Sequence, residues 1–209
     1  MINNTKNKSI QRELNSKIKR HDIINHLIAK NNFDTYLEIG IFDGFTFNQV
    51  KCQNKTGVDP GIEGIVIPQV THKMTSDDFF KICDRKYDII FIDGLHEYTQ
   101  VVKDFNNAVD HINDNGYILF HDCNPPDEES QYVPRQTVSW NGDVWKAFIL
   151  IKEVNPHAYV LDTDFGIGVV FNNSLNKVSN IENVHSLEEF FQNKKELLSL
   201  RHISKVEEV

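Results

Sequence analysis

The chain has 209 residues, of which 40% are hydrophobic and 25% are charged, and its formal net charge is −8. This composition is ordinary for a globular protein of one α/β domain, and the negative charge disfavours a nucleic-acid partner, which would need clustered Lys and Arg. No apolar run approaches the roughly 20 residues that span a membrane, and the N-terminus lacks the apolar core of a signal peptide, so we expect a cytoplasmic protein without a membrane partner.

Apolar residues near helical spacing predict a helix over residues 9–29, ahead of the first strand. This basic segment either caps the sheet edge or serves as a substrate lid or dimer arm. We expect a single domain over residues 1–209, with a helical cap (1–33), a core (34–172) and a helical extension (173–209).

Short apolar runs alternate with helical patterns through the core. The run over residues 87–94 is continuous, which is typical of a central parallel strand covered on both faces. The predicted parallel strands cover residues 35–39, 56–59, 66–74, 87–94 and 117–122, and a hairpin follows over residues 158–162 and 167–171. The fold class is therefore α/β, a doubly wound, mostly parallel seven-stranded sheet with an antiparallel C-terminal hairpin.

The helices expected between these strands leave one long loop. Helices are predicted over residues 79–83 and 98–112, the second ended by Gly116, and further helices are expected after Asp143 and after Ser186, two capping residues. Residues 124–141 have no regular period, and a loop of that length inside a domain is usually functional.

Ionisable side chains stand where successive predicted strands end. These residues are Glu38, Asp59, Asp93 and the pair His121-Asp122. Because ligands of open α/β sheets bind at the carboxyl ends of the strands, we expect these side chains to converge on one rim and to form the binding site.

The turn after the first strand indicates the kind of ligand. Residues 38–46 read Glu-Ile-Gly-Ile-Phe-Asp-Gly-Phe-Thr, whereas a pyrophosphate-binding turn has the spacing G-x-G-x-x-G. The ring of Phe42 and the carboxylate of Asp43 suit a pyrophosphate poorly. They favour a ligand with a cationic centre, a carboxylate and an amino group, a description that fits S-adenosylmethionine.

Four motifs give the chain a family resemblance. They are this strand-turn, Gly-Val-Asp-Pro at residues 57–60, Thr-Ser-Asp-Asp-Phe-Phe at 75–80 and Phe-Ile-Asp-Gly-Leu-His-Glu-Tyr at 91–98. Over about residues 34–172 the sequence resembles the class I S-adenosylmethionine-dependent methyltransferases, and among them the small metal-dependent O-methyltransferases related to catechol and macrolide-sugar O-methyltransferases. The resemblance implies a Rossmann-like methyltransferase fold.

The resemblance implies specific cofactor contacts. The residues concerned are Glu38, Gly40, Phe42, Asp43, Gly44, Thr46, Asp59, Ser76, Asp77 and Asp93. Those of the first turn would hold the methionine half, Asp59 would accept hydrogen bonds from both ribose hydroxyls, and Ser76 and Asp77 would meet the adenine edge.

The resemblance also implies a catalytic base and a metal site. His96 would be the base and Asp93 would face the transferable methyl group. Asp93, His121 and Asp122 would bind a divalent cation, Mg²⁺ or Mn²⁺. The family usually has an acid where this chain has His121, and an imidazole moves the preference toward a transition metal. His121 could instead hydrogen-bond Asp93 or Asp122 without an ion, and His96 could instead cap the following helix or lie on the surface.

These observations predict an S-adenosylmethionine-dependent methyltransferase that acts on a hydroxyl of a sugar, a glycan or a small molecule. The alternatives are an NAD-dependent oxidoreductase on the same sheet and a cofactor-binding protein without catalysis. Trp145 is expected in the core, and Trp140 either in the core or against the acceptor. Arg135 is a solvated loop residue or a partner for an acidic substrate.

Overall fold

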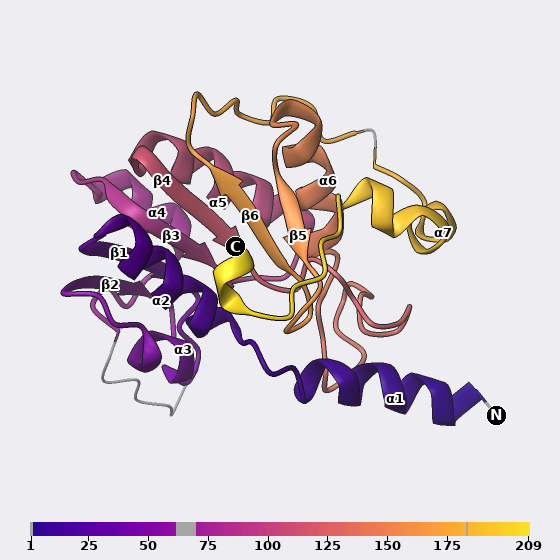
Figure 1. Cartoon of the computed structure of the whole chain (residues 1–209). Helices are drawn as coiled ribbons and strands as arrows, with labels where there is room; N and C mark the ends of the chain where they lie inside the picture. The colour runs from indigo at the N-terminus through magenta and orange to yellow at the C-terminus, as the bar shows by residue number, and fades with distance from the viewer. Residues whose placement is uncertain (1, 62–69, 183) are drawn as a thin grey trace.

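One mixed sheet organises the chain (Figure 1). The computed structural model describes residues 2–61, 70–182 and 184–209, and within these ranges the sheet has six strands in the order β2-β1-β3-β4-β6-β5. The strands are β1 (Thr35–Ile39), β2 (Asn54–Val58), β3 (Tyr87–Ile92), β4 (Ile112–Phe120), β5 (Tyr159–Leu161) and β6 (Ile167–Phe171). The first four are parallel, β6 is antiparallel to β4, and β5 is antiparallel to β6, so the predicted fold class and hairpin are confirmed.

The seventh predicted strand, over residues 66–74, lies partly outside the described residues. In the described part, His72 forms one isolated parallel bridge with Val58, at the free edge of β2. The backbone N–H groups of Thr71 and His72 both donate to the Gly57 carbonyl at 3.0 Å. The chain therefore follows the edge of β2 at this point, and the described sheet has six strands.

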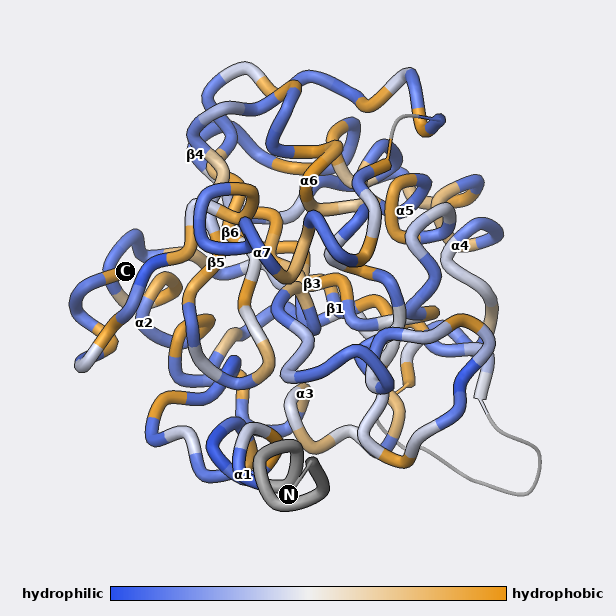
Figure 2. Tube along the Cα trace, turned by 90° about the vertical axis from the view of Figure 1, so that its right-hand side faces the viewer, coloured by the Kyte–Doolittle hydropathy of each residue, from blue (hydrophilic) through white to orange (hydrophobic). Residues whose placement is uncertain are grey.

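Helices cover both faces of the sheet, which is why β3 is apolar throughout. Ile89 and Phe91 of β3 face one hydrophobic core, and Ile90 and Ile92 face the other. The first core is closed by α2 (Arg20–Asn31), α3 (Phe45–Gln49) and the 3-10 turn η1 (Val206–Glu208). The second is closed by α4 (Ser76–Ile82), α5 (Tyr98–His111), α6 (Val144–Val154) and α7 (Leu187–Leu197). Figure 2 shows hydrophobic strands at the centre and hydrophilic segments around them.

The single helix predicted over residues 9–29 is wrong. The structure has two helices, α1 (Ile2–Leu14), which projects from the body in Figure 1, and α2. Lys19 is extended, with φ −108° and ψ 163°, and its N–H donates to the carboxylate of Asp22 at 2.9 Å. This polar cap starts a new helix, and α2 then covers a face of the sheet rather than its edge.

Two further local expectations need correction. Asp143 precedes α6, but its side chain makes no cap bond there, because Oδ1 accepts the N–H of Tyr98 at the start of α5 at 2.8 Å. Gly116 does not end a helix, since α5 already ends at His111 and Gly116 lies inside β4. By contrast, residues 124–141 contain no helix or strand, as predicted, and the Ser186 hydroxyl accepts the Glu189 N–H at the start of α7.

The strand order indicates where a ligand would bind, at the carboxyl ends of the parallel strands. β1 pairs with β2 on one side and with β3 on the other, and a sheet of this kind binds ligands outside the carboxyl ends of its strands, where the order reverses. No helix in the described ranges is both long and apolar enough to cross a membrane.

Candidate active site

A close backbone approach brings the ends of β1 and β3 together. Gly40 has φ +85°, and a Cβ atom at this position would lie 2.2 Å from the Asp93 carbonyl oxygen. The Asp93 N–H donates to the Ile39 carbonyl at 2.9 Å, and the Gly40 N–H donates to the Val58 carbonyl at 2.8 Å. Only a residue without a side chain fits here, so the turn after β1 lies directly beside Asp93.

Two carboxylates and two imidazoles meet at this edge. Asp93 Oδ1 lies 3.3 Å from His96 Nε2 and 3.2 Å from His121 Nδ1. Asp122 Oδ2 lies 3.2 Å from His96 Nδ1 and 3.1 Å from His121 Nδ1. The structure thus brings together four residues that the sequence placed at strand ends or just after one.

Asp122 and its neighbours hold this cluster in a fixed arrangement. The backbone of Asp122 has φ +62°, which is uncommon for a residue with a side chain. Its Oδ1 accepts a hydrogen bond from Asn141 Nδ2 at 2.6 Å, which joins the long loop to the end of β4. The Oδ1 of Asn141 is buried and has no partner among the described residues.

The residues of the cluster shift one another's pKa values. Burial disfavours the charged form of each group, but the attraction between the carboxylates and the cationic groups beside them is stronger than this effect. His121, His96 and Arg20 hold the pKa of Asp93 well below its usual range. Asp122 and Asp93 raise the pKa of His96, and they raise the pKa of His121 to about 10. His121 is therefore a buried cation that neutralises the two carboxylates.

Arg20, which sequence reasoning did not single out, is a fifth ionisable residue that contacts this cluster. Its Nε donates to the Thr46 hydroxyl at 2.9 Å and lies 3.9 Å from Asp93 Oδ2. Its Nη1 contacts His121 Nε2 and lies 3.4 Å from Asp164 Oδ2. The signal in the sequence was the basic run Lys19-Arg20-His21, which could as well have been a solvated helix start.

Glu38 lies within the sheet and is almost fully buried, with 1% of its surface exposed. The Tyr36 hydroxyl donates to Glu38 Oε2 at 2.6 Å. Burial raises the pKa of Glu38 to about 8, and the charge on Asp93 adds to this effect. At neutral pH the side chain is therefore mostly protonated.

The turn after β1 is held by Asp59, whereas Phe42 and Asp43 of the turn make few contacts of their own. Asp59 is bound to the turn, because Oδ2 accepts the Phe42 N–H at 2.9 Å and Oδ1 accepts the Gly61 N–H at 2.7 Å. Phe42 has 64% of its surface exposed. Asp43 makes only a local bond, from the Phe45 N–H to Oδ1 at 2.9 Å, and does not contact the carboxylate–imidazole cluster.

Ser76 and Asp77 belong to a different polar group. Gln100 Nε2 of α5 lies 3.3 Å from the Ser76 hydroxyl and 3.0 Å from Asp77 Oδ1. It also donates to Asp104 Oδ1 at 3.1 Å. Burial raises the pKa of Asp104 to about 6. The structure does not bring these side chains into contact with the cluster around Asp93.

The long loop supplies an aromatic wall. The ring of Trp140 stacks on the ring of His96 with centroids 5.2 Å apart, and its backbone carbonyl lies 3.1 Å from His96 Nδ1. Trp145 is fully buried and stacks on Phe190, as expected for a core residue. Arg135 is exposed and bonds to carbonyls of its own loop, with its guanidinium 5.8 Å from the Trp140 ring.

A metal ion could be held by part of this cluster. Asp93, His96 and Asp122 each offer one ligand atom, and these three atoms lie within 4.8 Å of one another. His121 Nδ1 faces the same carboxylates, but its Nε2 lies 2.8 Å from the Asp164 carbonyl and against Arg20. Two carboxylates and an imidazole suit Mn²⁺ or another transition metal better than Mg²⁺.

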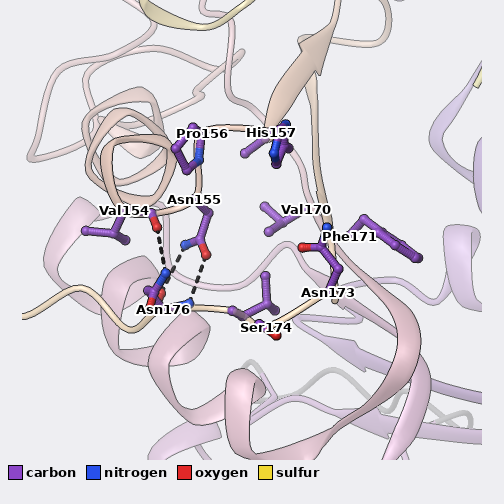
Figure 3. A pocket seen from close by; sticks show the side chains of 11 residues that line it. Val154, Asn155, Pro156, His157, Val170, Phe171, Asn173, Ser174 and Asn176 are labelled. Carbon is purple, nitrogen blue, oxygen red and sulfur yellow. Dashed lines mark hydrogen bonds between the residues drawn. The ribbon is translucent and has the colours of Figure 1, made fainter.

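A separate cavity of about 220 Å³ lies at the other end of the sheet, away from the carboxyl ends of the parallel strands (Figure 3). It is lined by residues 154–158, at the end of α6 and just after it, by the last two residues of β6, and by residues 173–176, which follow β6. The side chain of Asn155 on its wall bonds to the backbone of Asn176 twice: Oδ1 accepts the Asn176 N–H at 2.9 Å, and Nδ2 donates to the Asn176 carbonyl at 3.0 Å. The Asn155 amide is thus already paired within the protein.

Comparisons with known proteins agree with this geometry. A family described as "Methyltransferase domain" matches residues 37–123. An uncharacterized protein of Acanthamoeba polyphaga mimivirus is 29% identical over 171 residues, 70% of this chain and 72% of that protein. A candidate caffeoyl-CoA O-methyltransferase from Staphylococcus aureus superposes with a TM-score of 0.54 at 17% identity, over 78% of this chain and 89% of that chain. An O-methyltransferase from Bacillus cereus in complex with S-adenosylhomocysteine gives 0.53 at 11% identity, over 80% and 90%. These structural likenesses show the fold.

The buried carboxyl of Glu38 generates a prediction on stability. Its pKa of about 8 in the folded state lies above the ordinary value of 4.5, so the folded chain retains a proton that the unfolded chain loses in this window. Raising the pH from about 4.5 to 8 should therefore destabilise the wild type, with a limiting slope of about 1.4 kcal/mol per pH unit. Glu38→Gln carries no such charge. In urea unfolding at pH 5, 6.5 and 8, the stability of the variant relative to wild type should rise with pH, and a constant difference would contradict the assignment.

Proposed function

Because the chain carries a class I S-adenosylmethionine-dependent methyltransferase domain, we propose that it transfers the methyl group to a hydroxyl of a small molecule or sugar, with His96 as the base. The observation that carries this proposal is the contact of His96 with Asp93 beside the glycine turn at the switch point of the sheet. The family match favours methyl transfer over the oxidoreductase and non-catalytic alternatives. O-methylation is supported by the names of the structural neighbours, and the sugar by the resemblance of the sequence.

The acidic edge suits the charges of the cofactor. We assign the methionine half to Glu38, Gly40 and Gly44, at the end of β1 and in the turn that passes beside Asp93. Asp59 is assigned to the ribose, because each of its oxygens already accepts one backbone N–H and retains a free lone pair. The remaining assigned contacts are Phe42 and Thr46 at the amino-acid end, Asp43 in the turn between them, Ser76 and Asp77 at the adenine edge, and Asp93 at the transferable methyl group.

In the proposed reaction the acceptor oxygen attacks the sulfonium methyl, the new C–O bond forms as the C–S bond breaks, and the hydroxyl proton passes to His96. Asp122 and Asp93 raise the pKa of His96, which makes its neutral form a stronger base and also increases the fraction of His96 that is protonated before the reaction. The stacked ring of Trp140 restricts the orientation of the imidazole. Most of the rate gain would come from alignment of acceptor and methyl group.

A metal-assisted version is the second candidate, supported by the three donor atoms of Asp93, His96 and Asp122. The donor set fits a divalent ion, which would supply Lewis acidity and lower the pKa of the acceptor hydroxyl. His121, with Asp93 and Asp122, is the ligand set that the resemblance implies. If His96 binds the ion, it cannot also take the proton, so the two versions assign different roles to this residue.

Cofactor binding is the first test. S-adenosylhomocysteine should raise the melting temperature of the wild type, since it binds only the folded state. Asp59→Asn should lose most of this shift, because the amide nitrogen cannot accept a hydrogen bond from a ribose hydroxyl. Asp110→Asn, at a surface ion pair with Lys177, is the matched control and should keep it. An unchanged shift in Asp59→Asn would remove this residue from the ribose site.

Turnover tests the base. Methyl transfer from radiolabelled S-adenosylmethionine would be measured against a panel of catechols and sugars. For the acceptor found, His96→Gln should lower kcat by roughly 10²–10⁴-fold while the thermal shift with S-adenosylhomocysteine persists. His185→Gln, which removes a histidine paired with Glu189 on the surface, should retain activity. A kcat within about threefold of wild type in His96→Gln would refute its role as base.

Chelation separates the two versions. If an ion takes part, EDTA should suppress turnover, and Mn²⁺ should restore it at lower concentration than Mg²⁺ because one donor is an imidazole. The thermal shift with S-adenosylhomocysteine should survive EDTA and serves as the control. Full turnover in EDTA would discard the metal and leave His96 as the sole activator of the hydroxyl.

A further inference from the structure

Arg20 is surrounded by acidic residues, but part of its guanidinium makes no hydrogen bond to them. It contacts groups from α3, the end of β3, the end of β4 and the loop after β5, through Thr46, Asp93, His121 and Asp164. Its side chain keeps 24% of its surface exposed. Among the described residues its Nη2 group has no hydrogen-bond partner, so one edge of the guanidinium remains available.

A ligand carboxylate could bind at this acidic site only beside a cationic group such as the Arg20 guanidinium. A ligand carboxylate at this edge would lie near three carboxylates, those of Asp93, Asp122 and Asp164, and His121 supplies only one positive charge against them. Acidic residues suit the ammonium and sulfonium groups of S-adenosylmethionine, but they repel its carboxylate. A guanidinium offers the paired donors that bind a carboxylate, and it stays charged at all relevant pH values.

We propose that Arg20 is the carboxylate receptor of the site, and that it binds the carboxylate of the methionine half of the cofactor. This inference rests on the proposed function, because it needs S-adenosylmethionine to lie against the turn after β1. The bond from Arg20 Nε to the Thr46 hydroxyl places the guanidinium at that turn rather than beside Trp140, where the acceptor is expected.

Polar contacts attach residues 12–20 of the N-terminal segment to the loop after β5. Arg12 Nη2 pairs with Asp162 at 2.6 Å, the Thr163 hydroxyl donates to the Ile18 carbonyl at 2.7 Å, and the Arg20 N–H donates to Asp164 at 3.0 Å. These contacts hold the start of α2, and with it Arg20, beside the cluster.

The test compares two ligands that differ by the carboxylate alone, S-adenosylmethionine and decarboxylated S-adenosylmethionine, by calorimetry without acceptor. Wild type should prefer the carboxylated form, and Arg20→Gln should lose about 10- to 100-fold in affinity for it while its affinity for the decarboxylated form changes little. Arg20→Lys, which keeps the charge among the acids and protects the fold, should retain part of the preference.

Arg12→Gln is the matched control, because it removes a guanidinium from the same segment without reaching the cluster. It should keep the wild-type preference, and an equal loss in this variant would show that Arg20 acts only by docking the segment. An undiminished preference for the carboxylated form in both Arg20 variants would overturn the inference. If wild type binds neither ligand, the proposed function itself is wrong.

Discussion

Neutralisation of buried carboxylates is the constraint on which this site depends. The side chains of Asp122 and Asp164 are each 7% exposed and that of Asp93 is 16% exposed, and an unpaired carboxylate in such surroundings costs several kcal/mol. Their partners come from distant parts of the chain, since Arg20 is the first residue of α2 and His121 follows β4. The acidic edge can therefore exist only when the strand ends and the N-terminal segment have come together.

This arrangement gives the site a definite polarity. Asp93 lies just after the end of β3, and its depressed pKa means that a cationic ligand would find this carboxylate already ionised. Glu38 is the exception, because it is buried beside Tyr36 and holds a proton near neutral pH. One carboxyl group thus serves as a hydrogen-bonding partner within the sheet, while its neighbours carry charge toward the ligand. Burial and the position of the nearest cation decide which role each one has.

Much of the fold follows from local patterns that tertiary contacts do not override. The alternation of Ile89, Ile90, Phe91 and Ile92 between two cores explains why a continuous apolar run marks the central strand. The patterns fail where a polar side chain has two possible partners. Asp22 starts a new helix inside what was expected to be one, and Asp143 bonds to the neighbouring helix instead of its own. Helical periodicity contains no information on such choices, because both outcomes leave the spacing of apolar residues unchanged.

The sequence by itself determined the parallel core, the glycine turn and the presence of Asp93, His121 and Asp122 at strand ends, with His96 three residues after Asp93, because the carboxyl ends of parallel strands meet at one end of a sheet. Only the tertiary structure decided how they pair, that Ser76 and Asp77 face Gln100 instead, and that Arg20 enters the site. The physical reason is that Coulombic and hydrogen-bonding partners depend on distances across the fold, whereas residue type and spacing report only on local geometry.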